Sequence, residues 1–399
     1  MSTAPKPNLL VAQSGGPSMV INQSLAGVVT AARASRKVGA ILGARHGIRG
    51  ILDGDIVDLR KVTAEDLERI AATPSSALGS VRMKPKAEDC EAIFKALRRL
   101  GVKWFFYIGG NDSAETVDII NRHAEAAGED LVCFHVPKTI DNDLRENDHT
   151  PGFGSAARFV ACALMGDDLD NRALGGVKID VVMGRHAGFL TAAAALARRD
   201  PEDGPHLIYL PERPFSPDKF VADVMACVEK RGRCVVAVSE GISGPDGELI
   251  AAKFSHERDA HGNMQLSGSG ALGDALATLL KVRSGGKLRR VRADTFGYLQ
   301  RSFPGIASKT DSEEARQAGV EAVRAALSGD FKSGSIALRR KPGSEYGISY
   351  EVVALSAVAK ETKQLPDEFI APSGTDVTEA FLDYARPLVG DLPEIGHLG

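Results

Sequence analysis

The stretch NLLVAQSGGPS, residues 8–18, joins a short apolar run to a glycine turn. Asn8 to Ala12 has the composition of a short buried strand, and Gly15-Gly16 follows it closely. A segment with helical character then runs from Ser18 to about Ser35. Strand, glycine turn and helix in this order are the repeating unit of sheets with parallel strands. The stretch therefore predicts an α/β fold.

The same unit recurs along the chain. Strand WFFYI, residues 104–108, precedes the loop GGNDS at 109–113, and a strand at 131–136 precedes PKTIDND at 137–143. Further strands are predicted over 177–183, 207–210 and 234–239, helices over 188–198 and 310–327, and a strand or extended loop over 294–301. Ligands of doubly wound sheets bind at loops beyond the carboxyl ends of the strands. These loops are therefore the candidate sites.

Length and composition narrow the class of protein. A chain of 399 residues exceeds what one hydrophobic core usually serves, so two or more lobes are expected. A net charge of −3 provides no overall basic field for nucleic acid or an anionic membrane. The five cysteines have no close pairs, which indicates a reduced cytosol rather than a zinc site or a disulfide framework. No signal peptide is expected from the first residues, MSTAPKPNLL, and no transmembrane helix is expected, because no apolar run approaches about 18 residues.

The loop at Gly15-Gly16 is a candidate phosphate cradle. Glycines allow backbone N–H groups to approach an anion at the positive end of a helix. A strand-to-helix turn without any ligand would have the same sequence. The loop alone does not decide between the two interpretations.

The loop at residues 109–113 places three small polar residues after two glycines. Asp112 could hold Mg²⁺ or orient a phosphate, because hard cations prefer oxygen ligands. Asn, Asp and Ser are also the favoured caps of helix N-termini. Both roles are compatible with the same residues.

The segment from Lys138 to Asp143 is the densest cluster of polar side chains. Asp141 and Asp143 are two residues apart, so they face the same side if the segment is extended. One carboxylate can accept a hydroxyl proton, and Lys138 offers a point charge to a phosphate. A polar turn with Asx interactions is the alternative, but a turn does not require this combination, and we favour a functional site.

Taken together, these loops resemble those of the phosphofructokinase family. LVAQSGGPSMVIN at residues 10–22, the two loops just described, and GYLQR at 297–301 occur in the order of that family. Met183-Gly184-Arg185, Pro211-Glu212 and Glu240-Gly241 lie between them in the same order. The resemblance covers about residues 8 to 330.

The resemblance implies a fold of two doubly wound, Rossmann-like three-layer lobes with the active site in the cleft between them. The lobe that binds the phosphoryl donor is expected over residues 1–152 plus about 300–350. The lobe that binds the sugar phosphate is expected over residues 153–299 plus about 351–399.

The resemblance also implies a role for each matching residue. Asp141 is expected to be the general base that takes the proton of the sugar 1-hydroxyl, supported in catalysis by Lys138, Thr139 and Asp143. The residues expected to bind the donor are Gly15, Gly16, Arg82, Gly110, Asp112 and Ser113. The residues expected to bind the sugar phosphate are Met183, Gly184, Arg185, Glu240, Arg292, Tyr298 and Arg301. Mg²⁺ is the implied cofactor, with Asn111 and Asp112 as the residues at the metal.

Two positions bear on the identity of the donor. Members of the family that use ATP have Gly where this chain has Asp112, and many have Gly where it has Lys138. Members that use pyrophosphate resemble this chain at both positions. An Asp side chain takes space that the inner part of a nucleotide needs, and Lys can bind the departing phosphate. We therefore expect reversible, glycolytic transfer from pyrophosphate to fructose 6-phosphate in the cytoplasm, with ATP as the alternative donor.

Two departures from the family pattern affect details. Asn111 stands where the family usually has an Asp associated with Mg²⁺, so metal binding is expected to shift toward Asp112 or the phosphates. Gly176 stands where many members have an Arg that reaches a neighbouring subunit's site, and Arg172 or Lys178 is the candidate substitute. The resemblance implies a homo-oligomer, dimer or tetramer, in which Arg292 is the candidate residue supplied in trans.

Two other classes of function fit the sequence less well. A non-catalytic regulatory or sugar-phosphate-sensing subunit would be expected to lack catalytic carboxylates, whereas Asp141 and Asp143 are present. A nucleotide-binding dehydrogenase is disfavoured, because the Gly15-Gly16 loop lacks the G-x-G-x-x-G spacing.

Overall fold

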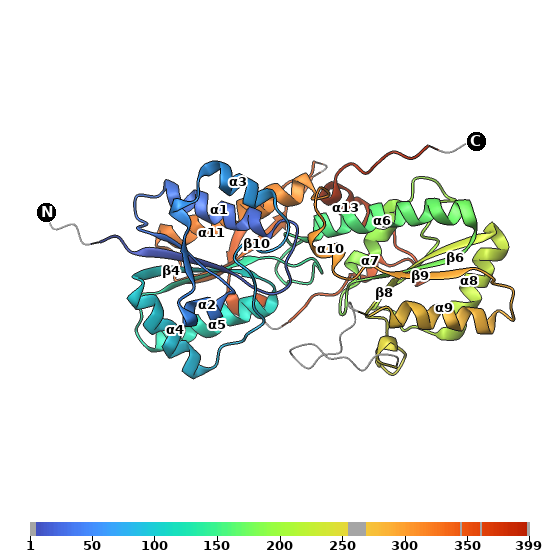
Figure 1. The fold of residues 1–399 in the computed structure, drawn as a ribbon, viewed down its shortest axis with the longest axis horizontal. Helices are drawn as coiled ribbons and strands as arrows, with labels where there is room; N and C mark the ends of the chain where they lie inside the picture. The colour runs from blue at the N-terminus through green and yellow to red at the C-terminus, as the bar shows by residue number, and fades with distance from the viewer. Residues whose placement is uncertain (1–4, 254–268, 344, 360, 397–399) are drawn as a thin grey trace. The chain divides into compact units, whose positions relative to one another are not determined.

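The computed structural model describes residues 5–253, 269–343, 345–359 and 361–396. The chain forms two compact units, each with its own sheet (Figure 1). Unit 1 comprises residues 1–140, 144–152 and 309–362, and unit 2 comprises residues 141–143, 153–308 and 363–399.

The sheet of unit 1 has seven strands in the order β11-β10-β5-β4-β1-β2-β3. The five inner strands run parallel, and the edge strands β11 and β3 pair antiparallel with their neighbours. The strands are β1 (Asn8–Gln13), β2 (Ile41–Ala44), β3 (Ile56–Asp58), β4 (Val102–Gly109), β5 (Val132–Pro137), β10 (Ser333–Arg340) and β11 (Ile348–Val353).

Helices cover both faces of this sheet, with α1, α3 and α11 over one face and α2, α4 and α5 over the other (Figure 1). The inner strands are buried on both faces, because alternate residues of β1 and β4 enter different cores. Leu9 and Phe106 belong to one core, and Leu10 and Phe105 to the other. The helices are α1 (Ile21–Ala34), α2 (Ile48–Asp53), α3 (Ala64–Ala72), α4 (Ala87–Arg99), α5 (Asn111–Ala126), α11 (Lys309–Ser328) and α12 (Leu355–Val358).

The sheet of unit 2 has four parallel strands in the order β7-β8-β6-β9. The strands are β6 (Gly176–Val182), β7 (Leu207–Tyr209), β8 (Arg233–Ser239) and β9 (Val291–Thr295). The helices of this unit are α6 (Phe153–Leu174), α7 (Phe189–Ala193), α8 (Pro217–Arg231), α9 (Ala271–Arg283), α10 (Leu299–Ser302) and α13 (Glu379–Val389).

Helices also lie on both faces of the second sheet, with α6 over one face and α9 over the other (Figure 1). Helix α8 shows how local sequence sets its ends. Ser216 caps the first turn by accepting the Lys219 N–H at 3.4 Å, Pro217 occupies the first turn, and Gly232 ends the helix with φ +75°.

The expected fold class is confirmed, since each unit is a layered α/β structure with a largely parallel sheet. Most expected strands lie within a residue or two of the observed ones. The expectation for residues 294–301 is wrong in its second half. Strand β9 ends at Thr295, Gly297 turns the chain with φ +52°, and residues 299–302 form a short helix.

None of the described helices is long and apolar enough to cross a bilayer.

Candidate functional site

In unit 1, the Lys138 side chain lies beside the glycine loop after β1. Its ammonium donates to the Gly16 carbonyl oxygen, and only 3% of the residue is exposed. Gly15 has φ +74°, and a Cβ there would stand 3.3 Å from Lys138 Nζ. Helix α1 starts only at Ile21, so Gly15-Gly16 does not open a helix as expected. The anion-attracting group at this loop is therefore an ammonium, not a helix N-terminus.

The next loop along the sheet joins the same cluster. The Ser14 and Ser113 hydroxyls are hydrogen-bonded to each other, which connects the loop after β1 to the first turn of α5. Gly110 is the residue before α5. The Gly109 carbonyl oxygen accepts the Lys138 N–H at 2.9 Å and His135 Nε2 at 2.8 Å. Three parallel strands thus end in one connected set of loops.

Arg82 lies on a loop that packs against Gly15. The Ser80 hydroxyl donates to the Gly15 carbonyl oxygen at 2.5 Å, and the Gly15 N–H donates to the Val81 carbonyl oxygen at 3.4 Å. Lys84, two residues beyond Arg82, pairs with Asp112 at 3.5 Å. The structure therefore brings the expected donor-binding residues of unit 1 into one neighbourhood.

The two residues expected at the metal begin helix α5. Asn111 Oδ1 accepts the Asp112 N–H at 2.9 Å, and the Asp112 side chain is 74% exposed. This pair offers one carboxylate and one amide oxygen, fewer ligands than a cage formed by protein alone. Mg²⁺ commonly binds one or two carboxylates together with substrate phosphates. The residues therefore fit a Mg²⁺ ion that is also held by phosphate oxygens.

Thr139 continues from Lys138 in unit 1, where its N–H donates to the Pro151 carbonyl oxygen at 3.2 Å. The next residues, Asp141 to Asp143, group with unit 2. Asn142 between the two carboxylates is fully buried, adopts φ +58°, and donates from its amide to the Tyr384 hydroxyl at 2.8 Å.

The Asp143 carbonyl oxygen accepts the Lys363 N–H at 2.8 Å. Asn142 and Asp143 therefore both have partners from the C-terminal part of unit 2. The backbone just after Asp141 is therefore held by the buried side chain of residue 142 and by a main-chain hydrogen bond at residue 143.

The loops after β6 and β8 pack closely in unit 2. The Glu240 N–H donates to the Val182 carbonyl oxygen at 2.9 Å, and the Ser239 hydroxyl donates to the Gly184 carbonyl oxygen at 2.7 Å. A Cβ at Gly241 would stand 2.2 Å from the Arg185 carbonyl oxygen, so only glycine allows this approach. These contacts bring Gly184, Arg185 and Glu240 together.

The end of β9 supplies the remaining residues. The Arg301 guanidinium lies 4.9 Å from the centre of the Tyr298 ring, and Gln300 Oε1 accepts the Met183 N–H at 3.2 Å. Met183, Tyr298 and Arg301 therefore lie at neighbouring strand ends of one sheet.

Arg292 is placed differently from the other sugar-phosphate candidates. It lies within β9, opposite Lys178 of β6, and it lines a cavity of about 190 Å³ along this edge of the sheet. Within the described residues, its guanidinium donates only to the Val291 carbonyl oxygen, at 3.2 Å.

The family model described as phosphofructokinase matches residues 8–326. This chain belongs to the phosphofructokinase family. The match spans both units and includes every residue singled out above except those of the C-terminal segment.

Similar proteins also cover nearly the whole chain. The pyrophosphate--fructose 6-phosphate 1-phosphotransferase of Rhodospirillum rubrum is 54% identical, over 96% of this chain and 95% of that protein. The protein of the same name from Xanthomonas campestris pv. campestris is 40% identical, over 97% and 92%. The crystal structure of a pyrophosphate-dependent phosphofructokinase from Nitrosospira multiformis has a TM-score of 0.86 at 35% identity, over 98% and 94%.

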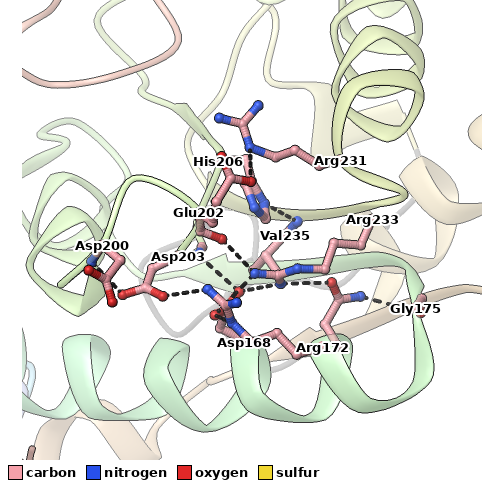
Figure 2. A network of polar contacts seen from close by, with 12 residues as sticks. Asp168, Arg172, Gly175, Asp200, Glu202, Asp203, His206, Arg231, Arg233 and Val235 are labelled. Atoms are coloured by element: carbon pink, nitrogen blue, oxygen red, sulfur yellow. Dashed lines mark hydrogen bonds and ion pairs between the residues drawn. The ribbon is translucent and has the colours of Figure 1, made fainter. Parts of the chain in front are cut away.

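Arg172 and Lys178 are the candidate substitutes for the Arg that many phosphofructokinases have at the position of Gly176. Arg172 lies between Asp168 and Asp203, with Nε 3.0 Å from Asp168 and Nη2 2.5 Å from Asp203 (Figure 2). Arg233 also bonds to Asp168 in this network. Lys178, the other candidate, pairs with Asp167, Asp180 and Asp294. Both cations are thus held by carboxylates of their own unit.

The sequence analysis did not single out two histidines that lie next to the candidate site residues. His186 follows Arg185 directly, and burial together with the Arg185 charge lowers the pKa of its imidazole, against the charge of Asp141. Burial lowers the pKa of His135 to about 4, so this ring is neutral where it holds Gly109. The adjacency of His186 to Arg185 was a signal in the sequence. The sequence carried no signal for the contact of His135 with Gly109, because a histidine within a buried strand can simply be part of the core.

Proposed function

We propose that this chain transfers a phosphoryl group from pyrophosphate to the 1-hydroxyl of fructose 6-phosphate, releasing phosphate and fructose 1,6-bisphosphate. The observation that carries the proposal is the buried Lys138 ammonium against the Gly15-Gly16 loop. A charged amine this well buried requires anionic or carbonyl partners. In this proposal, the Lys138 ammonium binds the inorganic phosphate that is released from pyrophosphate.

Unit 1 is the donor-binding part in this proposal. Gly15, Gly16, Gly110 and Ser113 provide loop backbone and a hydroxyl at adjacent strand ends, and Arg82 adds a guanidinium. Asp112 projects from the first turn of α5, where its exposed carboxylate takes space and adds negative charge. That placement supports pyrophosphate over the alternative donor, ATP, and it agrees with the names of the two relatives reported above.

Unit 2 is the sugar-phosphate part. Arg185 and Arg301 provide charge-assisted hydrogen bonds to the 6-phosphate, with Met183, Gly184, Glu240 and Tyr298 forming the surrounding surface. Asp141 accepts the 1-hydroxyl proton as that oxygen attacks phosphorus, and Asp143 and Thr139 support it. Asn142, bonded to Tyr384, holds the backbone between the two carboxylates.

Mg²⁺ is the proposed cofactor, held by Asp112 and Asn111 together with the donor phosphates. When bound, it would neutralise charge on the phosphate oxygens. A cytoplasmic location is part of the same proposal and is supported by the substrate class and by the free cysteines.

The donor is tested by assaying purified protein with fructose 6-phosphate and either pyrophosphate or ATP. We expect turnover with pyrophosphate, formation of fructose 1,6-bisphosphate and phosphate, and a measurable reverse reaction. A clear preference for ATP would contradict the proposed donor. Inactivity with both donors would favour a regulatory or sugar-phosphate-sensing subunit.

The base is tested with Asp141→Asn. Loss of a general base costs typically 10²–10⁴-fold in rate, and we expect a fall in kcat of about that size. Thermal unfolding of the variant serves as the folding control. Unchanged kcat in a folded variant would remove Asp141 from its role.

A homo-oligomer that supplies Arg292 in trans completes the proposal. Support comes from the position of Arg292, which is exposed on an edge strand and without a carboxylate partner among the described residues. Light scattering after gel filtration should show a dimer or tetramer. Mixing Arg292→Ala with Asp141→Asn should restore activity, to about a quarter of wild type for a freely exchanging dimer. A fully active monomer would contradict this part.

A further inference from the structure

Lys84 joins two elements that flank the donor-binding loop. Its ammonium lies 2.6 Å from Glu115 Oε2 and 3.5 Å from Asp112 Oδ1. Both carboxylates belong to the first turns of α5, whereas Lys84 belongs to the loop that carries Arg82. One cation thus ties that loop to the start of the helix.

The two ion pairs are not equivalent. The Glu115 side chain is 13% exposed and its contact with Lys84 is short, whereas the Asp112 side chain is largely in solvent. Glu115 is therefore the anchor, and Asp112 is the carboxylate whose charge the ammonium offsets.

The same loop is held at its other end by the glycine loop. Ser80 donates to the Gly15 carbonyl oxygen, and the Gly15 N–H donates to Val81. Arg82 therefore stands two residues from Ser80 at one anchor and two residues from Lys84 at the other. A loop fixed at both ends loses little further entropy when Arg82 meets an anion.

The positive charge of Lys84 also affects the repulsion between Asp112 and the donor. Asp112 places a negative charge next to the loops proposed to hold pyrophosphate, which is itself strongly anionic. Without a neighbouring cation, whether the proposed Mg²⁺ or an ammonium, that carboxylate would repel the donor. An ammonium 3.5 Å from Asp112 offsets the repulsion while leaving the side chain in the space that a nucleotide would need.

We propose that Lys84 is a positioning residue for the phosphoryl donor, which it serves by anchoring the Arg82 loop to Glu115 and by offsetting the charge of Asp112. This inference rests on the proposed function and deepens it. In this inference, the bulk of the Asp112 side chain excludes a nucleotide. The Lys84 ammonium offsets the Asp112 charge, so that pyrophosphate can still bind.

The first test is Lys84→Met with Lys84→Arg as the rescue. We expect the KM for pyrophosphate to rise roughly two- to fivefold in the Met variant, as loss of a partly exposed ion pair would cause. The KM for fructose 6-phosphate should stay within about twofold, and the Arg variant should recover most of the loss. Calorimetric titration of pyrophosphate alone should show the same weakening without turnover.

Lys86→Met is the matched control, since it removes the same charge two positions away on an exposed side chain. We expect its KM for pyrophosphate to stay near that of the wild type. If Lys84→Met and Lys86→Met weaken pyrophosphate equally, the effect is general electrostatics and the inference is wrong.

Glu115→Gln separates anchoring from net charge. If Lys84 acts through its anchor, removing Glu115 raises the KM for pyrophosphate, and the double variant with Lys84→Met is no worse than Lys84→Met alone. If only net charge matters, removing the Glu115 carboxylate lowers the KM for pyrophosphate. That result would contradict the anchoring role of Glu115. An unchanged KM in Lys84→Met would overturn the whole inference. Failure of wild-type protein to use pyrophosphate would instead be a failure of the proposed function.

Discussion

The ammonium of Lys138 lies against the backbone of Gly15, so close that a Cβ at residue 15 would stand 3.3 Å from Nζ. Lys138 follows β5 and Gly15 follows β1, with β4 between the two strands. The contact thus joins loops that follow the first and third of three neighbouring strands.

Gly15→Ala should damage donor binding more than folding. The φ of +74° costs an alanine about 1–2 kcal/mol, and its methyl group would also press on the Lys138 ammonium. We expect kcat/KM for pyrophosphate to fall at least tenfold. Gly128→Ala is the control, because Gly128 has φ +69° and open space around it. Equal loss of activity in both variants would count against a special role for the Gly15 contact.

Tyr384→Phe should loosen the backbone between the catalytic carboxylates. The variant removes one hydrogen bond of the buried Asn142 amide, and a hydrogen bond contributes about 0.5–1.5 kcal/mol to stability. We expect a lower kcat with a near-normal KM for pyrophosphate, together with a lower Tm. Full kcat in this variant would show that Asn142 does not position Asp141.

His135 should make stability depend on pH below neutrality. Burial lowers its pKa to about 4, so the unfolded chain, with a histidine pKa of about 6.5, binds the proton more readily. The resulting stability is present above about pH 6.5 and is lost as the pH falls toward 4. The loss should reach about 2 kcal/mol between about pH 7 and pH 5.

Denaturant unfolding of His135→Gln at several pH values measures this contribution. We expect the difference between wild type and variant to shrink as the pH falls. His123→Gln, at an exposed histidine of α5, is the control. A difference that does not change with pH would refute the assignment.

Asp180→Asn should stabilise unit 2 at neutral pH. Burial, followed by the nearby Asp167 carboxyl, raises the pKa of Asp180 well above its usual value, and the Lys178 ammonium at 3.9 Å does not offset this. Neither carboxyl oxygen has a hydrogen-bond partner within the described structure. An acid with a raised folded pKa destabilises the fold increasingly as the pH rises above its unfolded value of about 3.9.

The Asn variant removes that penalty because its amide is neutral at every pH. We expect a Tm a few degrees higher at pH 7 to 8, with the gain disappearing toward about pH 4. Asp294→Asn, which alters an exposed carboxylate of the same cluster, should not show this pattern. A lower Tm for Asp180→Asn at neutral pH would mean that Asp180 is ionised and needed by Lys178.

Local sequence predicted strands β1, β4, β5, β6, β7 and β8 and the order of the loops that follow them, but it did not predict β2, β3, β10 or β11. Buried runs such as residues 104–108, followed by glycine and small polar residues, define strand ends without any knowledge of the rest of the chain. That information is local because backbone conformation and alternating burial depend on near neighbours. It failed at residues 299–302, where a turn at Gly297 redirects the chain into a short helix.

The tertiary structure alone decided which side chains meet. Lys138 and Gly16 are 122 positions apart, and only the strand order β5-β4-β1 brings their loops to one edge. The pairing of Lys84 with Glu115 and the enclosure of Arg172 by Asp168 and Asp203 were equally invisible in the sequence. Such contacts depend on packing between segments that are far apart in the sequence. A local sequence pattern does not indicate which distant segment will pack against it. The candidate residues could thus be predicted from the sequence, whereas their contacts with distant residues are known only from the tertiary structure.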